Sequence, residues 1–487
     1  MVIILIIYGA AAAFLFAYSL VQSSLLYKYI YKRKELKNHT KLSSDFVPLV
    51  TIQLPLYNEL YVVERLIDKV CEMDYPKDKL EIQVLDDSTD ESIQLSKDKV
   101  EEWKSKGVDI VYIHRTNRKG YKAGALEDAL IEAKGEFIAI FDADFLPEKS
   151  FLQRTVPHFQ DDKIGMIQTR WGHLNRNYNF LTKLQAFALD AHFTIEQVGR
   201  NAKDGFINFN GTAGVWRKEC IIDAGNWSPD TLTEDLDLSY RAQLKDWQFI
   251  YLENVESPAE LPPVMSALKT QQYRWTKGGA ETARKHVRNV MKSNKSFGNK
   301  WHGIMHLLNS GVFVSIMVCA FLSIPLLIIK SQVPGFNYIF IAASVLMLSF
   351  AVLGAFYLTA FFKIRGRNLK NFFIFLGMFP LFIVVSMGLS LHNAIAVIEG
   401  YMGKKSSFVR TPKFNISEKT DSWKKNIYIP TKISWLSMLE GAFALYFFFG
   451  IFLAFYFNEF GLLSFHIMMS LGFSIVFLYS VFQSSKN

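Results

Sequence analysis

Two carboxylates one residue apart, Asp142 and Asp144, follow a run of apolar residues at 137–141. The run is rich in β-branched and aromatic side chains, which predicts a strand buried on both faces and therefore a parallel sheet. Ligands of such sheets bind just beyond the carboxyl ends of the strands. Where the strand turns into a loop, both carboxylates could approach one divalent cation, because such cations prefer oxygen ligands. Taken alone, the pair is also explained by the preference of Asp for turns.

Other polar groups follow three further strand-like stretches, at 50–54, 81–85 and 110–113. The loops after these stretches carry, in order, Tyr57 with Glu59, Asp86 with Asp87, and Arg118 with Lys122 in a glycine-spaced basic loop. Acids at one strand end and cations at the next suit a nucleotide, with the acids near the base or ribose and the cations near phosphate. Helix capping explains an acid such as Asp87 equally well.

The sequence excludes two common ways of holding phosphate. No Walker-type loop and no G-x-G-x-x-G follows any strand-like stretch, unlike in NTPases and dinucleotide oxidoreductases. A third way of holding phosphate remains, in which a metal ion bound by Asp142 and Asp144 bridges the diphosphate. The three cysteines, at unrelated spacings, indicate neither a disulfide framework nor a metal-binding knuckle.

Two later segments add candidate functional residues. Gly211 and Gly214 lie close together among aromatic residues, which indicates a backbone that a ligand approaches closely or, equally, a tight β-bulge. A helical pattern then begins with Thr233 as its expected N-cap and with Glu234 and Asp235 in its first turn. Acidic residues in the first turn of a helix interact favourably with the helix dipole, so Glu234 and Asp235 could be explained without any further role. As a catalytic group, Asp235 would be a general base at the functional edge of the sheet.

Strands and helices alternate along this part of the chain. Helical patterns occupy 59–73, 90–106 and 123–133, between the strand-like stretches. Such alternation predicts an α/β domain with a mostly parallel sheet and right-handed crossovers. Pro262 and Pro263 end the pattern, and a long basic amphipathic helix follows that contains Arg274 and Trp275. These two residues suit an interfacial anchor, and they also lie where an acceptor would enter the membrane.

The apolar residues make up 50% of the 487-residue chain and are unevenly distributed. Runs of about 20 apolar residues, the length that spans a bilayer, lie at 2–22, 305–329, 338–362, 435–457 and 461–482. The chain is therefore predicted to be an integral membrane protein with a soluble insert. The run at 372–398 contains Pro380 and has basic loops on both sides, which favours a re-entrant or interfacial helix pair over a single crossing.

The distribution of charge predicts the orientation. Basic residues cluster at 28–41, after the first apolar run, and none precedes it. The N-terminus is therefore expected outside, and the soluble insert in the cytoplasm, at a plasma (inner) membrane. The first run lacks a basic leading segment and a small-residue cleavage site, which predicts a retained anchor. The net charge of +9 reflects this pattern and contact with anionic lipids, and it does not indicate nucleic-acid binding.

Four motifs follow one another between the apolar runs: Asp86-Asp87, Asp142-x-Asp144, Thr233-Glu-Asp235 and Gln271-Gln-Tyr-Arg-Trp275. They resemble the D, D-x-D, T-E-D, Q-x-x-R-W signature of the processive family-2 glycosyltransferases of the cellulose synthase superfamily. The local sequence at 117–125, 141–145, 209–216 and 260–262 is most similar to cellulose-synthase-like mannan and glucan synthases, which make glucomannan and xyloglucan backbones. Residues 408–413 resemble the F-x-V-T-x-K gating loop of bacterial cellulose synthase. Arg410 departs from its Val, and Phe145 stands where that enzyme has His after the D-x-D.

The resemblance implies a GT-A fold, an α/β domain with a mostly parallel sheet inserted between transmembrane helices. It also implies a nucleoside-diphosphate sugar donor, UDP-glucose or GDP-mannose, with Mn²⁺ or Mg²⁺ at Asp142 and Asp144. Asp235 would be the catalytic base. The implied donor-binding residues are Tyr57, Glu59, Asp86, Asp87, Lys122, Gln271, Arg274 and Thr411, and the implied acceptor-binding residues are Trp275, Phe209 and Glu234.

The expected organisation begins with an N-terminal anchor at 1–26, a cytoplasmic catalytic domain at 48–262 and amphipathic interface helices at 263–303. Two transmembrane helices at 304–363, re-entrant or interfacial helices at 372–400, a gating-loop-like segment at 404–430 and two transmembrane helices at 435–483 follow. The expected activity is inverting hexosyl transfer that extends a β-linked glucan or mannan, β-1,4-linked in our first hypothesis, and translocates it. The alternative is a single transfer to a lipid, as in the ceramide- or diacylglycerol-glucosyltransferases.

Overall fold

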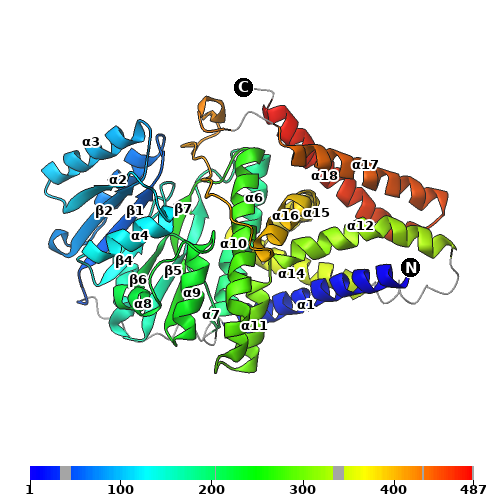
Figure 1. Cartoon of the computed structure of the whole chain (residues 1–487), viewed down its shortest axis with the longest axis horizontal. Coiled ribbons are helices and arrows are strands. Elements are labelled where there is room, and N and C mark those ends of the chain that lie inside the picture. The colour runs from blue at the N-terminus through cyan, green and yellow to red at the C-terminus, as the bar shows by residue number, and fades with distance from the viewer. Residues whose placement is uncertain (33–44, 203–204, 333–344, 430–432, 485–487) are drawn as a thin grey trace.

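The computed structural model describes residues 1–32, 45–202, 205–332, 345–429 and 433–484. It contains a domain built around one sheet and, beside it, a group of long helices (Figure 1). Helix α1 (Val2–Lys32) precedes the sheet domain in the chain, yet it packs against α12 (Gly311–Gln332) and α14 (Val345–Arg365), which follow that domain. The sheet domain is thus an insert between helical segments, as the distribution of apolar residues predicts.

A seven-stranded sheet forms the centre of the domain, with the strand order β3-β2-β1-β4-β6-β5-β7. All paired strands run parallel except β6, which is antiparallel to both of its neighbours. The mostly parallel sheet predicted from the sequence is therefore confirmed. The strands are β1 (Val50–Leu56), β2 (Leu80–Asp86), β3 (Ile110–His114), β4 (Phe137–Ile140), β5 (Ile164–His173), β6 (Gly214–Arg217) and β7 (Gln248–Ala259).

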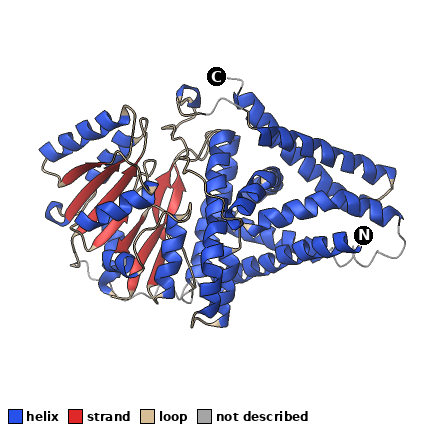
Figure 2. Cartoon of the chain, in the orientation of Figure 1, coloured by secondary structure: helices blue, strands red, loops and turns tan. Residues whose placement is uncertain are grey.

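Helices cover both faces of the sheet (Figure 2). On one face, α2 (Val63–Cys71), α3 (Ser92–Ser105) and α5 (Phe151–Thr155) belong to the same hydrophobic cluster as Phe137 and Ala139 of β4. On the other face, α4 (Tyr121–Glu132), α8 (Lys218–Asp223) and α9 (Glu234–Leu244) pack on Ile138 and Ile140. Successive side chains of a strand point to opposite faces, so β4 has to be apolar throughout, as its sequence is.

The connections create a crevice at one edge of the sheet. The chain runs from β1 outward to β2 and β3, and then returns to place β4 on the other side of β1. After β1 the chain continues toward one edge of the sheet and after β4 toward the other, and ligands of open α/β sheets bind at such a switch point. The carboxylates of the D-x-D follow β4, so the topology puts them at this crevice.

The long helices lie in the apolar parts of the chain, where the sequence predicts membrane segments. Among the described residues, six helices are long and apolar enough to cross a membrane: Val2–Tyr31, Gly311–Gln332, Leu348–Arg365, Leu369–Gly388, Trp435–Tyr456 and Phe460–Ser484. They fit a multi-pass membrane protein. The basic residues at 33–41 and the first part of the predicted span at 338–362 lie outside the described residues.

The segment predicted to be a re-entrant or interfacial helix pair forms two helices, α15 (Leu369–Gly388) and α16 (Ser390–Tyr401), separated by Leu389. Helix α15 continues through Pro380 and is itself one of the six apolar helices. Figure 1 shows the pair nearly end-on, whereas α1, α12, α17 (Trp435–Tyr456) and α18 (Leu463–Ser484) lie lengthwise in the same view. The interfacial placement of the pair stays a prediction.

Buried polar contacts join the two parts of the molecule. Gln22 of α1 donates to Glu196, 3.2 Å away in a π-helical turn at His192–Glu196 of the sheet domain. Lys269, on the long helix α10 (Met265–Lys292), pairs with Glu440 of α17 at 2.6 Å. Because a buried charge is costly without its partner, the Lys269–Glu440 pair fixes the position of α10 relative to α17.

Candidate active site

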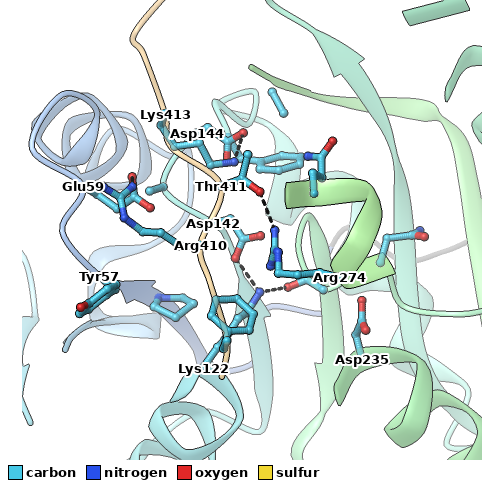
Figure 3. Close-up of a pocket in the computed structure, with 18 of the residues that line it drawn as sticks. Tyr57, Glu59, Lys122, Asp142, Asp144, Asp235, Arg274, Arg410, Thr411 and Lys413 are labelled. Carbon is cyan, nitrogen blue, oxygen red and sulfur yellow. Dashed lines mark hydrogen bonds and ion pairs between the residues drawn. The ribbon is translucent and has the colours of Figure 1, made fainter. Parts of the chain in front are cut away.

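One pocket at the carboxyl ends of the strands gathers most of the residues that the sequence singles out. Its walls are the loops after β1 and β4, the first turn of α9, the start of α10 and the segment 408–413 (Figure 3). Of the candidate residues, the pocket is lined by Tyr57, Glu59, Asp87, Lys122, Asp142, Asp144, Glu234, Asp235, Gln271, Arg274, Trp275 and Thr411. The tertiary structure thus brings together motifs that are far apart in the chain.

Lys122 lies at the centre of the acidic groups. Its ammonium group is 2.6 Å from Asp142 Oδ1, 2.7 Å from the carbonyl oxygen of Gly211 and 3.9 Å from Glu234 Oε1. Burial lowers the pKa of Lys122, but the carboxylates of Asp142 and Glu234 outweigh that effect and hold the pKa above its ordinary value. Lys122 therefore carries a fixed positive charge on the wall opposite α10 (Figure 3).

Asp235 projects into the pocket from the first turn of α9 (Figure 3). Burial and the adjacent Glu234 carboxylate raise the pKa of Asp235 to about 7, although Lys122 opposes the shift. A carboxylate with such a pKa is suited to accept a proton near neutral pH. Thr233 is the N-cap, as predicted, but its side chain makes no capping hydrogen bond and instead lies 3.1 Å from the hydroxyl of Thr282 on α10.

Gly211 makes room for Asp235. Its φ of +81° is one that side chains disfavour, and an added Cβ would lie 3.0 Å from Asp235 Oδ2 and 3.5 Å from Lys122 Nζ. The groups that approach Gly211 are thus two site residues, and the approach of a ligand to this backbone stays a prediction. Asn210, beside it, also lines the pocket.

The segment 408–413 closes one side of the pocket through three polar contacts. Lys413 Nζ lies 2.7 Å from Asp144 Oδ2, Thr411 Oγ1 accepts a hydrogen bond of 3.0 Å from Arg274, and Arg410 pairs with Glu59 at 3.1 Å. Arg274 also lies over the ring of Phe408, 4.7 Å from its centre. The segment therefore contacts the D-x-D, the Q-x-x-R-W helix and the loop after β1 at once.

Glu260 anchors the continuation of this segment. Its buried carboxylate accepts hydrogen bonds from the backbone N–H groups of Phe414 and Asn415, the closer ones at 3.1 and 2.9 Å. Burial and the charge of Asp144 raise the pKa of Glu260 to about 7, against the effect of Lys413 and Arg65. A single acid at the end of β7 thus holds the segment where Lys413 meets Asp144.

At the far end of the pocket from Asp235, Tyr57 and Arg118 stack, with the guanidinium 3.3 Å from the ring centre. Asp87 lines this end, and both of its carboxylate oxygens accept hydrogen bonds from Arg115, at 2.8 and 2.6 Å. Asp86 does not reach the pocket. It is fully buried and accepts hydrogen bonds from the Tyr112 hydroxyl and the Ser88 N–H, so it shapes the loop after β2.

Aromatic rings form the wall beside the apolar helices. Trp275 lines the pocket with its ring centre 6.4 Å from that of Trp171, which is stacked on Phe193 and meets Phe145 edge-on. Flat aromatic surfaces of this kind suit the apolar face of a sugar ring. The structure does not bring Phe209 to the pocket, because its side chain is fully buried against Trp216 and Trp227.

The carboxylates of the D-x-D fit a divalent cation. Asp144 Oδ1 is buried without a hydrogen-bond partner among the described residues, and the Asp142 side chain is 34% exposed to the pocket. Among those same residues, no cluster of three or more His, Cys, Asp or Glu could hold a metal ion by itself. The remaining ligands would be diphosphate oxygens and water, as is usual for Mg²⁺ at phosphate sites.

Sequence reasoning did not assign Trp171, Glu260, Arg410 or Lys413 to the site. Lys413 and Arg410 belong to the gating-loop-like motif, and Glu260 belongs to the family-like motif Glu260-Leu-Pro262. The sequence therefore did contain a signal for these three residues. Trp171 lies near the end of β5, and only the tertiary structure brings its ring to Phe145, directly after the D-x-D.

Comparison with known proteins identifies the family. Residues 48–278 match the family described as "Glycosyltransferase like family 2". The chain is 32% identical to glucomannan 4-beta-mannosyltransferase 7 of Arabidopsis thaliana over 431 residues, which cover 85% of this chain and 74% of that protein. It is 38% identical to glucomannan 4-beta-mannosyltransferase 9 of the same plant (66% and 62% covered) and 42% identical to glucomannan 4-beta-mannosyltransferase 1 of Oryza sativa subsp. japonica (52% and 50% covered).

A solved structure agrees with the fold. The mannosyltransferase PcManGT from Pyrobaculum calidifontis, determined in complex with GDP-Man and Mn²⁺, superposes with a TM-score of 0.53 and 17% identity, covering 81% of this chain and all of that one. At this identity the likeness supports the GT-A fold and no more. The fold, the gathered motifs and the identity to the plant relatives lead to one conclusion: the chain belongs to glycosyltransferase family 2, in its cellulose-synthase-like branch, and is a membrane hexosyltransferase.

Proposed function

We propose that this enzyme transfers mannose from GDP-mannose to the growing end of a β-1,4-linked glycan at the cytoplasmic face of the plasma (inner) membrane. The names of the plant relatives, all glucomannan 4-beta-mannosyltransferases, support mannose and the linkage. The single observation that carries the proposal is the arrangement of the pocket, with a candidate base, Asp235, on one side of the D-x-D and a possible nucleoside site on the other (Figure 3).

The donor diphosphate would lie in the middle of the pocket. Asp142 and Asp144 would hold Mn²⁺ or Mg²⁺, which when bound would neutralise the negative charge of the leaving diphosphate. Lys122, Arg274 and Lys413 bring three positive charges to the same region, and Thr411 brings a hydroxyl group. Charge that is fixed before the reaction stabilises a leaving group without the cost of reorganising water.

The acceptor would lie between Asp235 and the aromatic wall. Trp275 would stack on the terminal sugar, and Asp235 would take the proton of its attacking hydroxyl. The hydroxyl oxygen would attack the anomeric carbon from the side opposite the diphosphate, so the configuration inverts. One base and one stabilised leaving group suffice for this single displacement, and no covalent intermediate with the enzyme is required.

Helix α10, which carries Trp275, packs against α16 and against α18, one of the six apolar helices. A polymer that grows away from Asp235 would therefore meet the membrane part of the protein. We propose that the chain leaves in this direction and is translocated through the apolar helices. The catalytic domain would then be cytoplasmic, in line with the basic residues that flank the apolar segments.

The test is incubation of the purified full-length protein with radiolabelled GDP-mannose and, separately, UDP-glucose, each with Mn²⁺. Products are separated by solvent extraction and digested with a β-1,4-mannanase or a β-1,4-glucanase. We expect label from GDP-mannose in an insoluble polymer that the mannanase degrades. Label from UDP-glucose alone would overturn the donor, and label found wholly in the organic phase would instead indicate a single transfer to a lipid.

A further inference from the structure

The end of the pocket opposite Asp235 holds an unusual pair of charged residues. A donor with its sugar at Asp235 and its diphosphate at Asp142 and Asp144 must place its nucleoside there. In Figure 3 this end is occupied by Tyr57, Glu59 and Arg410. The inference rests on the proposed function, because it takes the donor to be a nucleoside-diphosphate sugar.

Arg410 reaches the nucleoside end from the segment that closes the pocket. Thr411 points toward α10 and Arg410 points the other way, toward the loop after β1 (Figure 3). The Arg410 guanidinium donates to Glu59 Oε2 at 3.1 Å and lies 4.1 Å from the ring centre of Tyr428, whose hydroxyl donates to Asp90. Glu59 and the Tyr428 ring thus hold the guanidinium in place.

This pair retains unused hydrogen-bonding capacity. Arg410 Nη2 is buried and has no hydrogen-bond partner among the described residues, although the residue lines the pocket. The side chains of Arg410 and Glu59 are only 12% and 10% exposed. Buried donors are nearly always paired, so an unpaired one in a ligand pocket indicates a group that the ligand supplies.

The hydrogen-bonding edge of guanine matches an arginine beside a carboxylate. Guanine presents two acceptors, N7 and O6, to which arginine can donate two parallel hydrogen bonds. Two donors, N1–H and the 2-amino group, follow O6 on the adjoining Watson–Crick edge, and the two oxygens of a carboxylate can accept from both. Uracil carries a carbonyl oxygen in place of the 2-amino group, and that oxygen would face the carboxylate unfavourably.

We propose that Arg410 and Glu59 together read the guanine edge of the donor, and that this pair makes the enzyme select GDP-sugars over UDP-sugars. Arg410 donates to O6 and N7, and Glu59 accepts from N1–H and the 2-amino group. Arg410 belongs to the segment 408–413, so base recognition would involve the same segment that closes one side of the pocket.

The experiment measures the affinities of GDP, UDP and inosine diphosphate for the full-length protein in nanodiscs, with Mn²⁺ in every titration. Inosine diphosphate lacks only the 2-amino group of GDP. The variants are Arg410→Gln, Glu59→Gln and, as a matched control, Lys419→Gln, which removes an exposed positive charge from the same part of the chain. Thermal unfolding, measured on the same preparation, reports whether each variant is folded.

In the unmodified protein we expect GDP to bind more tightly than UDP and inosine diphosphate. Arg410→Gln should weaken GDP binding on the order of 10- to 100-fold and leave UDP binding unchanged. Glu59→Gln should abolish the preference for GDP over inosine diphosphate, and Lys419→Gln should change nothing. Equal loss of GDP and UDP affinity in Arg410→Gln would mean that Arg410 holds the diphosphate, and would overturn the proposal. An unchanged ratio of GDP affinity to UDP affinity in an Arg410→Gln protein that still transfers mannose would also overturn the proposal. Absence of mannose transfer by the unmodified protein would overturn the proposed function itself.

Discussion

Lys413 Nζ lies 2.7 Å from Asp144 Oδ2, so a segment between the apolar helices is paired with the D-x-D of the sheet domain. The contact means that the 408–413 segment is closed over the pocket in this structure. A cation bound at Asp144 would compete with Lys413 for the same carboxylate, and the lysine would then be free to meet the diphosphate. We therefore expect entry of the donor to be coupled by charge to the release of Lys413 from Asp144.

Replacing Asp235 with Asn should abolish transfer and leave donor binding intact. The amide keeps the size of the side chain but cannot accept the proton of the acceptor hydroxyl, and a positioned base contributes on the order of 10²- to 10⁴-fold in rate. Polymer synthesis and GDP affinity are measured on the same preparation. Asp162→Asn, at an exposed position, is the control and should behave like the unmodified protein. Near-normal synthesis by Asp235→Asn would contradict the assignment of the base.

The rate should depend on pH through Asp235. Burial and Glu234 raise the pKa of Asp235 to about 7, and only the deprotonated form can act as the base. The value of kcat/KM should therefore fall as the pH drops below about 7 and level off above it. Glu59 and Glu260 also have pKa values raised to about 7, mainly by burial. The acidic limb should thus persist in Glu59→Gln and Glu260→Gln. A flat profile between pH 6 and 8 would contradict the prediction.

Replacing Gly211 with Ala should impair catalysis as well as stability. The positive φ would cost about 1–2 kcal/mol with any side chain, and the added Cβ would press on the Asp235 carboxylate, 3.0 Å away. Gly107→Ala is a matched control, because Gly107 has a φ of +79° but nothing within 4 Å of an added Cβ. Thermal unfolding should show both variants destabilised, while polymer synthesis should fall only in Gly211→Ala. Equal activity of the two variants would argue against the close approach to Asp235.

Replacing Glu260 with Gln should loosen the segment that closes the pocket. Hydrogen bonds to a charged acceptor contribute about 1.5–3 kcal/mol each, and Glu260 accepts them from the backbone of Phe414 and Asn415. The KM for the donor should rise about 10-fold, and limited proteolysis should cut within 404–430 more rapidly. Glu418→Gln, at an exposed position of the same segment, should leave both measurements unchanged.

Removal of the divalent cation should stop donor binding. Asp142 and Asp144 are the acids that would hold Mn²⁺ or Mg²⁺, and the charges of the diphosphate need that cation in the pocket. Chelation should abolish GDP-mannose binding, and added Mn²⁺ should restore it in the unmodified protein but not in Asp142→Ala. Full binding in the presence of the chelator would show that Lys122, Arg274 and Lys413 hold the diphosphate without a metal ion.

Local sequence patterns determined the elements of this protein, because those patterns follow from burial. Strand β4 has to be apolar on both faces, and helices that cross a bilayer need about 20 apolar residues. The order of strands and helices also placed Asp142 and Asp144 at a strand end, and Lys122 in the connection between two strands. The order of the motifs along the chain was enough to identify Asp235, Arg274 and Trp275 as candidates.

Only the tertiary structure decided which candidates meet. Asp86 and Asp87 are neighbours in the chain, yet the end of β2 turns one into the interior and the other toward the pocket. Phe209 has the sequence context of a ligand-binding residue, but the packing of α9 and β6 buries it. The pairs Lys413–Asp144 and Arg410–Glu59 join residues that no local pattern relates, because long-range contacts depend on how the whole chain packs.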